Sequence, residues 1–182
     1  MRIIGPDDPP EAREPARTVL VPAGAGEVVH VLADSATLKV GQEDTAGALS
    51  MVELTLQPGG AVPDHLHAHE DETLYVLEGT LDVRVGDQRL TLGAGGCAFA
   101  PRGTAHAFAN RGFAPARVLQ VSSPAVEPTR AFLELAAGFA AGVAAGPHGP
   151  VARPDGGVLA SAFRALAASR DVTLVPTDDA AG

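Results

Sequence analysis

Short runs of β-branched and aliphatic residues, separated at regular intervals by Gly, Pro and Asp turn signals, dominate the first two thirds of this 182-residue chain. Many short strands in succession with such turns favour a barrel or a sandwich of two sheets. Gly86-Asp87 joins two of these runs in a tight hairpin. The sequence therefore predicts an all-β fold with strands at 17–21, 28–32, 37–40, 49–57, 72–78, 81–85, 88–92, 97–100, 105–109 and 117–122.

The spacing of apolar residues changes after Pro124. Phe132, Leu135 and Phe139 fall at helical spacing, which predicts an amphipathic helix over 129–141 lying across the barrel. A Gly/Pro-rich connector at 142–157, a second helix over 157–169 and a strand over 172–175 complete the expected C-terminal part. The chain then divides into an N-terminal arm (1–16), a barrel (17–123) and a helical extension (124–182).

Three histidines stand at every second position, His65, His67 and His69, just ahead of Glu72. A strand projects alternate side chains to one side, so His65 and His67 are expected to point together toward the interior. Two imidazoles in that arrangement can bind one cation. This stretch is typical of one half of a metal site.

Two stretches carry a more specific pattern of fixed residues. The first has Gly59, His65, His67, Glu72 and Gly79, with five, one, four and six residues between them. The second has Gly95, Pro101, Gly103, His106 and Asn110, with five, one, two and three residues between them. Position for position, they resemble the two sequence motifs of the cupin superfamily. The resemblance covers about residues 45–122 and implies a double-stranded β-helix, the small jelly-roll barrel.

The resemblance also implies a ligand set, in which His65, His67, Glu72 and His106 hold one divalent transition metal (Fe, Mn, Ni or Zn). The alternative is that these are ordinary core histidines beside a solvated carboxylate. That alternative would bury imidazoles and a carboxylate without partners, which is costly. Residues expected on the same face are candidates for the wall of a substrate pocket, although core packing explains each equally well; they are Pro63, Leu74, Val76, Thr104 and Phe108.

Other polar residues near the histidines have simpler explanations. His69 shares the parity of His65 and His67, but the motif does not include it, so we expect a histidine at the pocket rim or surface. Asp64, Glu70 and Asp71 are expected to form a solvated turn rather than to act in acid–base catalysis.

A softer resemblance, to quercetin 2,3-dioxygenase-like proteins, implies a non-haem dioxygenase acting on a small enolic or phenolic (flavonol-like) compound. The metal would lower the pKa of the substrate oxygen, and Glu72 would bind the substrate hydroxyl and act as the catalytic base. Two alternatives stay open because one fold hosts many functions. One is a redox-inert metal enzyme (isomerase, decarboxylase or polyketide-type cyclase), and the other is a non-catalytic small-molecule-binding cupin.

The composition excludes some classes of partner. With 13 basic and 22 acidic residues the net charge is -9, which disfavours nucleic acids and anionic membranes. The single Cys97 cannot form an intrachain disulfide and is expected to pack as a small hydrophobic residue. Without a recognisable signal peptide or spanning segment, we expect a cytoplasmic protein. The exposed edge of the N-terminal strands predicts a homodimer.

Overall fold

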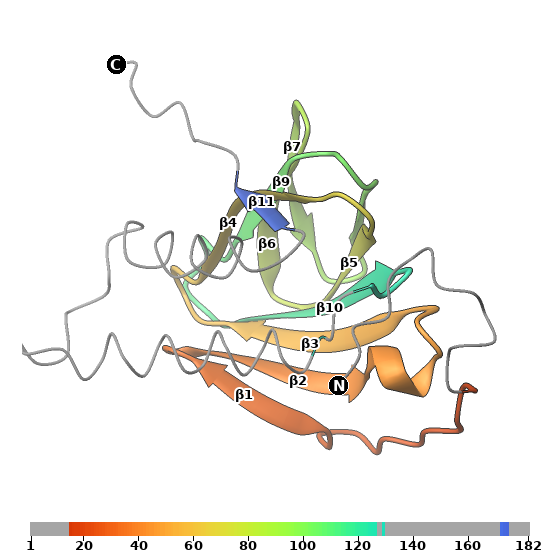
Figure 1. Cartoon of the computed structure of the whole chain (residues 1–182). Coiled ribbons are helices and arrows are strands. Elements are labelled where there is room, and N and C mark those ends of the chain that lie inside the picture. The colour runs from red at the N-terminus through yellow and green to blue at the C-terminus, as the bar shows by residue number, and fades with distance from the viewer. Residues whose placement is uncertain (1–14, 127–128, 130–171, 175–182) are drawn as a thin grey trace, which may run out of the picture.

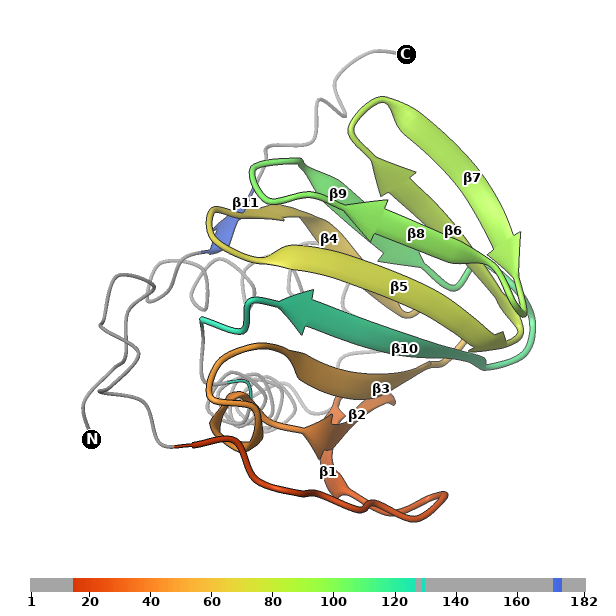
Figure 2. The same cartoon turned by 90° about the vertical axis from the view of Figure 1, so that its right-hand side faces the viewer.

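The computed structural model describes residues 15–126, 129 and 172–174. These residues form two antiparallel sheets packed face to face, shown in Figures 1 and 2. The strands are β1 (Glu27–Val31), β2 (Asp34–Val40), β3 (Ser50–Leu56), β4 (Ala61–His67), β5 (Asp71–Glu78), β6 (Thr80–Val85), β7 (Gln88–Gly93), β8 (Cys97–Ala100), β9 (His106–Ala109), β10 (Ala116–Ser123) and β11 (Val172–Leu174).

The order of strands within each sheet defines the fold. One sheet runs β1-β2-β3-β10-β5-β8, and the other runs β11-β4-β9-β6-β7. From β3 to β10 the chain therefore crosses repeatedly from one sheet to the other, as the side view in Figure 2 shows. The double-stranded β-helix that the resemblance implies is confirmed.

The core lies between the two sheets and is built from one face of each strand. In β5, Glu72, Leu74 and Val76 are buried while Tyr75 and Leu77 are exposed, which is the expected alternation. The main cluster of buried apolar side chains comprises Leu56, Leu74, Val76, Leu81, Val83, Phe108 and Val118. The polar site described below shares this interior.

Two of the motif residues stabilise the backbone of turns and are not candidate metal ligands. Gly79 adopts a positive φ of 77°, and a Cβ at this position would lie 2.7 Å from the carbonyl oxygen of Pro115. Asn110 is fully buried, and its side-chain amide donates to the carbonyls of Leu56 and Ala114, both at 2.8 Å. These positions therefore serve the backbone of the barrel.

The segment 17–21 is not a strand, so that prediction is wrong. Two contacts from Arg17 attach it to the chain at Asp44: the Arg17 amide donates to the carbonyl of Asp44, and the Arg17 guanidinium pairs with the Asp44 carboxylate at 2.6 Å. Leu20 in this apolar run is 89% exposed, so its side chain is not part of the core. The loop between β2 and β3 contains one short 3-10 turn, Gln42–Asp44.

Cys97 is exposed, which corrects the expectation that it packs as a buried hydrophobic residue. In β8 the inward positions are taken by Ala98 and Ala100. Cys97 and Phe99 therefore lie on the outer face of the sheet, opposite Tyr75 and Thr73 of β5.

The expected C-terminal strand is present as β11 over Val172–Leu174, and Val175, the last residue of the predicted strand, lies outside the described residues. β11 pairs with β4 in the register Val172↔His67 and Leu174↔His65, so it extends the sheet beside the histidine-bearing strand. The predicted helices over 129–141 and 157–169 and the predicted connector over 142–157 lie outside the described residues except for Thr129, as does the arm over 1–16 except for Pro15 and Ala16. Within the described residues no helix is long and apolar enough to cross a membrane.

Candidate metal centre

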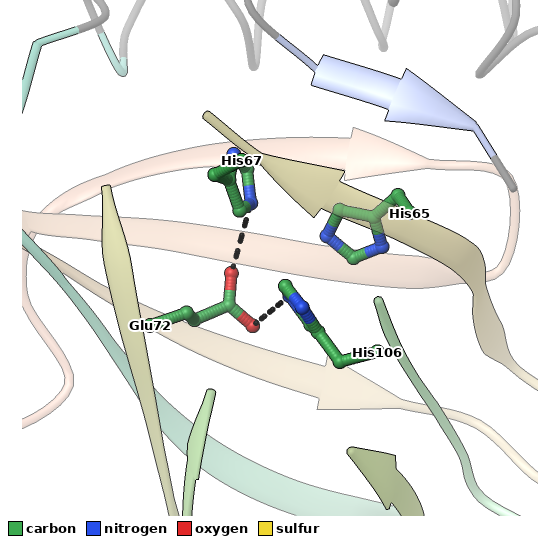
Figure 3. A group of neighbouring side chains, drawn as sticks. All are labelled: His65, His67, Glu72 and His106. Atoms are coloured by element: carbon green, nitrogen blue, oxygen red, sulfur yellow. Dashed lines mark ion pairs between the residues drawn. The ribbon is translucent and has the colours of Figure 1, made fainter. Parts of the chain in front are cut away.

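Four side chains from three strands converge between the two sheets. His65 and His67 come from β4, Glu72 from β5 and His106 from β9, and one ligand atom of each lies within 4.8 Å of all the others. Figure 3 shows them pointing toward one another. Because β4 and β9 belong to one sheet and β5 to the other, the cluster bridges the interior of the barrel. The sequence motifs predicted these four residues, and the fold brings them together.

The spacing of the ligand atoms suits one cation. His67 Nε2 lies 3.4 Å from Glu72 Oε2, and His106 Nε2 lies 3.5 Å from Glu72 Oε1. Two atoms that each lie about 2.1 Å from one ion are about 3.0 Å apart at a right angle and about 3.4 Å apart at a tetrahedral angle. Small side-chain adjustments would therefore place all four groups around a common ion.

Three of these atoms are buried without a hydrogen bond. His67 Nε2, Glu72 Oε1 and His106 Nε2 have no hydrogen-bond partner among the residues that the structure describes. Each buried, unsatisfied polar atom costs about 1–3 kcal/mol, and more for a charged group. A cation would satisfy all three at once, so the residues present fit a bound metal.

Backbone carbonyls fix the tautomers of two of the histidines. His65 Nδ1 lies 2.8 Å from the carbonyl oxygen of Pro63, and His106 Nδ1 lies 2.9 Å from that of Thr104. A carbonyl can only accept, so each Nδ1 carries the proton and donates it. The Nε2 atoms are then left with the lone pair that a metal ligand needs.

The charge states of the cluster also suit a cation. Burial lowers the pKa of His65 to about 4, which keeps that imidazole neutral at physiological pH. Burial alone raises the pKa of Glu72, but His106 and His67 outweigh it and hold the pKa well below its usual value. Burial lowers the pKa of His106, yet the Glu72 carboxylate outweighs this and raises it. Because a metal binds only the unprotonated ring nitrogen, metal binding would compete with protonation of His106.

Residues 52–122 match the family model described as the cupin domain. This part of the chain is a cupin domain. Its curated relatives include the tetracenomycin polyketide synthase protein TcmJ of Streptomyces glaucescens, 41% identical over 80 residues, or 44% of this chain and 52% of TcmJ. Germin-like protein 1-1 of Oryza sativa subsp. japonica is 35% identical over 88 residues, or 46% of this chain and 41% of that protein. The cupin thus spans about half the length of these relatives or less.

Solved structures share the fold of this cupin. KdgF from Halomonas sp. superposes with a TM-score of 0.53 at 18% identity, over 59% of this chain and 94% of KdgF. An RmlC-like cupin from Shewanella frigidimarina superposes with a TM-score of 0.52 at 20% identity, over 60% of this chain and 94% of that one. At these identities the superpositions show a shared fold and nothing about function.

Sequence reasoning missed one residue of the cupin site. Gln120, on β10, donates from its side-chain amide to Glu72 Oε2 at 2.7 Å. The position of Gln120 in its strand could have indicated it. Gln120 lies two residues from both Val118 and Ser122, which are buried, so it belongs to the same inner face of the strand. A polar residue at such a position requires a polar partner inside.

The predicted pocket residues have two different roles in the structure. Leu74, Val76 and Phe108 belong to the apolar core cluster, which agrees with the alternative stated for them. Pro63 and Thr104 contribute the carbonyls that orient the histidines. Contact of any of these five with a substrate stays a prediction.

Two carboxylates on and after β4 are less solvated than expected. Glu70 is 7% exposed and its Oε1 accepts the amide of Val126 at 2.7 Å, while Asp64 forms a largely buried ion pair with Arg84. Both depart from the solvated turn that the sequence suggested, because each carboxylate finds a partner distant in the sequence. Asp71 is partly exposed and pairs with Arg102, and His69 is exposed, as predicted for a surface histidine.

Proposed function

We propose that this cupin is a metal-dependent enzyme that acts on a small enolic or phenolic compound and uses O2 as co-substrate, that is, a non-haem dioxygenase. The observation that carries the proposal is the convergence of His65, His67, Glu72 and His106 around buried ligand atoms that lack hydrogen bonds. Such a set of three imidazoles and one carboxylate suits Fe, Mn, Ni or Zn.

The protein's own groups would prepare the substrate for the reaction. A divalent cation held by the four side chains would withdraw electron density from an enol or phenol oxygen and lower its pKa. Four protein ligands leave one or two positions in a five- or six-coordinate site, where the substrate oxygen can bind. Glu72, held as a carboxylate, would accept the hydroxyl proton of the substrate. Both atoms of O2 would enter the product, so no external reductant is needed.

A second candidate is favoured by the similarity to TcmJ. That relative is named as a polyketide synthase protein, and polyketides carry carbonyl groups that readily form enols and phenols. A redox-inert metal enzyme of the isomerase, decarboxylase or polyketide-type cyclase class would use the same four ligands only to polarise a carbonyl. Both candidates share a substrate class and differ in their need for O2.

The test compares metal content and oxygen dependence. Protein purified without added metal is analysed for Fe, Mn, Ni and Zn and incubated with a panel of flavonols and polyketide-derived phenols, in air and under strict anaerobiosis. The dioxygenase predicts O2 consumption that matches substrate loss and that stops after chelation. Turnover that persists without O2 selects the redox-inert enzyme, and tight ligand binding without turnover selects a non-catalytic binding protein.

Two histidine variants provide the matched comparison. His106→Ala removes one member of the cluster, whereas His69→Ala removes an exposed histidine two positions from His67. Turnover should be lost in the first and retained in the second. Equal loss in both would contradict the assignment of the site.

We further propose that the cupin forms a homodimer through β1. This strand ends the six-stranded sheet, and its outer edge meets no other strand within 15–126 and 172–174. An unpaired edge offers backbone donors and acceptors to a second copy. Light scattering after size-exclusion chromatography should give twice the mass of the 18.4 kDa chain; a monomer at all concentrations would contradict the proposal.

A further inference from the structure

Gln120 lies on the strand that packs directly against the Glu72 strand. β10 is paired with β3 on one side and β5 on the other, and Gln120 stands opposite Val52 and Leu74. Its inward-facing neighbours along β10 are the buried Val118 and Ser122. The amide of Gln120 therefore enters the interior from a strand that carries none of the four clustered residues.

The two oxygens of Glu72 have different surroundings. Oε2 accepts the Gln120 amide at 2.7 Å, a short and well-formed hydrogen bond. Oε1 is buried, has no hydrogen-bond partner in the described part of the chain, and lies 3.5 Å from His106 Nε2. Oε2 also lies 3.4 Å from His67 Nε2, so each oxygen faces one histidine, and the hydrogen bond from Gln120 is what distinguishes the two oxygens.

This asymmetry decides how the carboxylate can bind a cation. A carboxylate binds either through one oxygen or through both, and the second mode occupies an additional coordination position. The Gln120 hydrogen bond occupies one lone pair of Oε2 and fixes the orientation of the carboxylate, which favours binding through Oε1 alone. Partners that orient a metal-binding group in this way commonly change metal affinity by about 10- to 100-fold when they are removed.

We propose that Gln120 is a positioning residue that restricts Glu72 to binding the metal through Oε1 alone. The inference rests on the proposed metal site and deepens it. By keeping the protein to four ligand atoms, Gln120 preserves an open position for the substrate. The oxygen that it leaves free is also the one that faces His106.

The test uses Co(II) as the probe with the full-length chain. Gln120→Met keeps the length and volume of the side chain but removes the amide donor. We expect Co(II) affinity, measured by titration, to fall by about 10- to 100-fold. We also expect the visible absorption of bound Co(II) to weaken, because absorption by Co(II) decreases as its coordination number rises.

Ser122→Ala is the matched control. Ser122 is buried on the same face of β10 and stands opposite Glu72 in the register with β5. Its loss should leave the Co(II) affinity and spectrum as in the wild type. The melting temperature of each metal-free variant shows whether it is folded, and Gln120→Asn, whose shorter amide cannot reach Oε2, serves if Gln120→Met does not fold.

The outcomes separate this inference from the proposed function. A wild-type chain that binds no Co(II) overturns the metal site and the inference with it. A wild-type chain that binds Co(II), with folded Gln120 variants of equal affinity and unchanged spectrum, overturns the inference alone. Weaker binding with an unchanged spectrum also overturns it, because Gln120 would then act without altering how Glu72 binds.

Discussion

His65 and His106 lie directly opposite each other on neighbouring strands, with their ring centroids 4.2 Å apart. Each ring directs Nδ1 to the carbonyl oxygen of the residue two positions earlier. The same local hydrogen bond thus orients both imidazoles, one from each motif. Two rings fixed by their own backbones form a preorganised pair, to which His67 and Glu72 add the remaining groups.

The metal-free protein should lose stability in acid because of His65. Burial lowers its pKa from 6.5 to about 4, so the unfolded chain binds more protons between these values. The stabilisation is therefore complete above about pH 6.5 and is lost as the pH falls toward 4. We expect the difference in unfolding free energy between the wild type and His65→Asn to change by up to about 3 kcal/mol over this range.

Urea unfolding at several pH values, with chelator present throughout, measures this difference. A difference that stays constant from pH 4 to 7 would show that His65 is not held neutral by its surroundings.

Bound metal should stabilise the fold through the four clustered residues. A metal at one hundred times its dissociation constant adds about 2.7 kcal/mol to the unfolding free energy. We expect thermal melts to show this gain for the wild type and for His69→Ala, whereas His67→Ala should show little of it. An equal gain in both variants would place the metal elsewhere.

The apolar core predicts a strong contrast between two leucines of the hairpin β6–β7. Leu81 is 0% exposed within the core cluster, whereas Leu90 is 66% exposed. Leu81→Ala should cost about 3 kcal/mol through lost burial and the cavity left behind, and Leu90→Ala about 0.5 kcal/mol or less. Denaturant unfolding of the chelated protein measures both, and similar costs would contradict the packing described.

Glycine substitutions separate backbone strain from steric conflict. Gly79 and Gly95 both have positive φ, of 77° and 86°, but a Cβ at Gly79 meets backbone at 2.7 Å while one at Gly95 meets nothing within 4 Å. Gly95→Ala should cost about 1 kcal/mol, the usual penalty for a left-handed residue. Gly79→Ala should cost clearly more, and an equal melting temperature for the two variants would count against the geometry at Gly79.

The sequence predicted the barrel and the clustered residues for two separate reasons. Alternation along segments such as 72–78 assigned Glu72, Leu74 and Val76 to one face, because a strand has a period of two. The grouping of His106 with the β4 histidines came instead from the resemblance of two motifs. Local spacing cannot show that β9 pairs with β4.

The features that the sequence did not predict depend on contacts between distant residues. Gln120 stands 48 positions from Glu72, and Val126 stands 56 positions from Glu70. The hydrogen bonds from His65 and His106 to the carbonyls of Pro63 and Thr104 involve backbone acceptors, which no side-chain pattern in the sequence indicates. The run at 17–21 has strand-like composition, but none of the strands in the described part of the chain pairs with it, and it does not form a strand.

Metal content is the most direct test of the central claim that His65, His67, Glu72 and His106 hold one cation inside the barrel. Elemental analysis should be made on the wild type, His69→Ala and His106→Ala, each purified without added metal and again after reconstitution with Fe, Mn, Ni or Zn. We predict about one transition-metal ion per chain for the wild type and His69→Ala, and far less for His106→Ala. A wild-type chain that takes up no metal under any of these conditions, or a His106→Ala chain that retains it in full, would contradict the account.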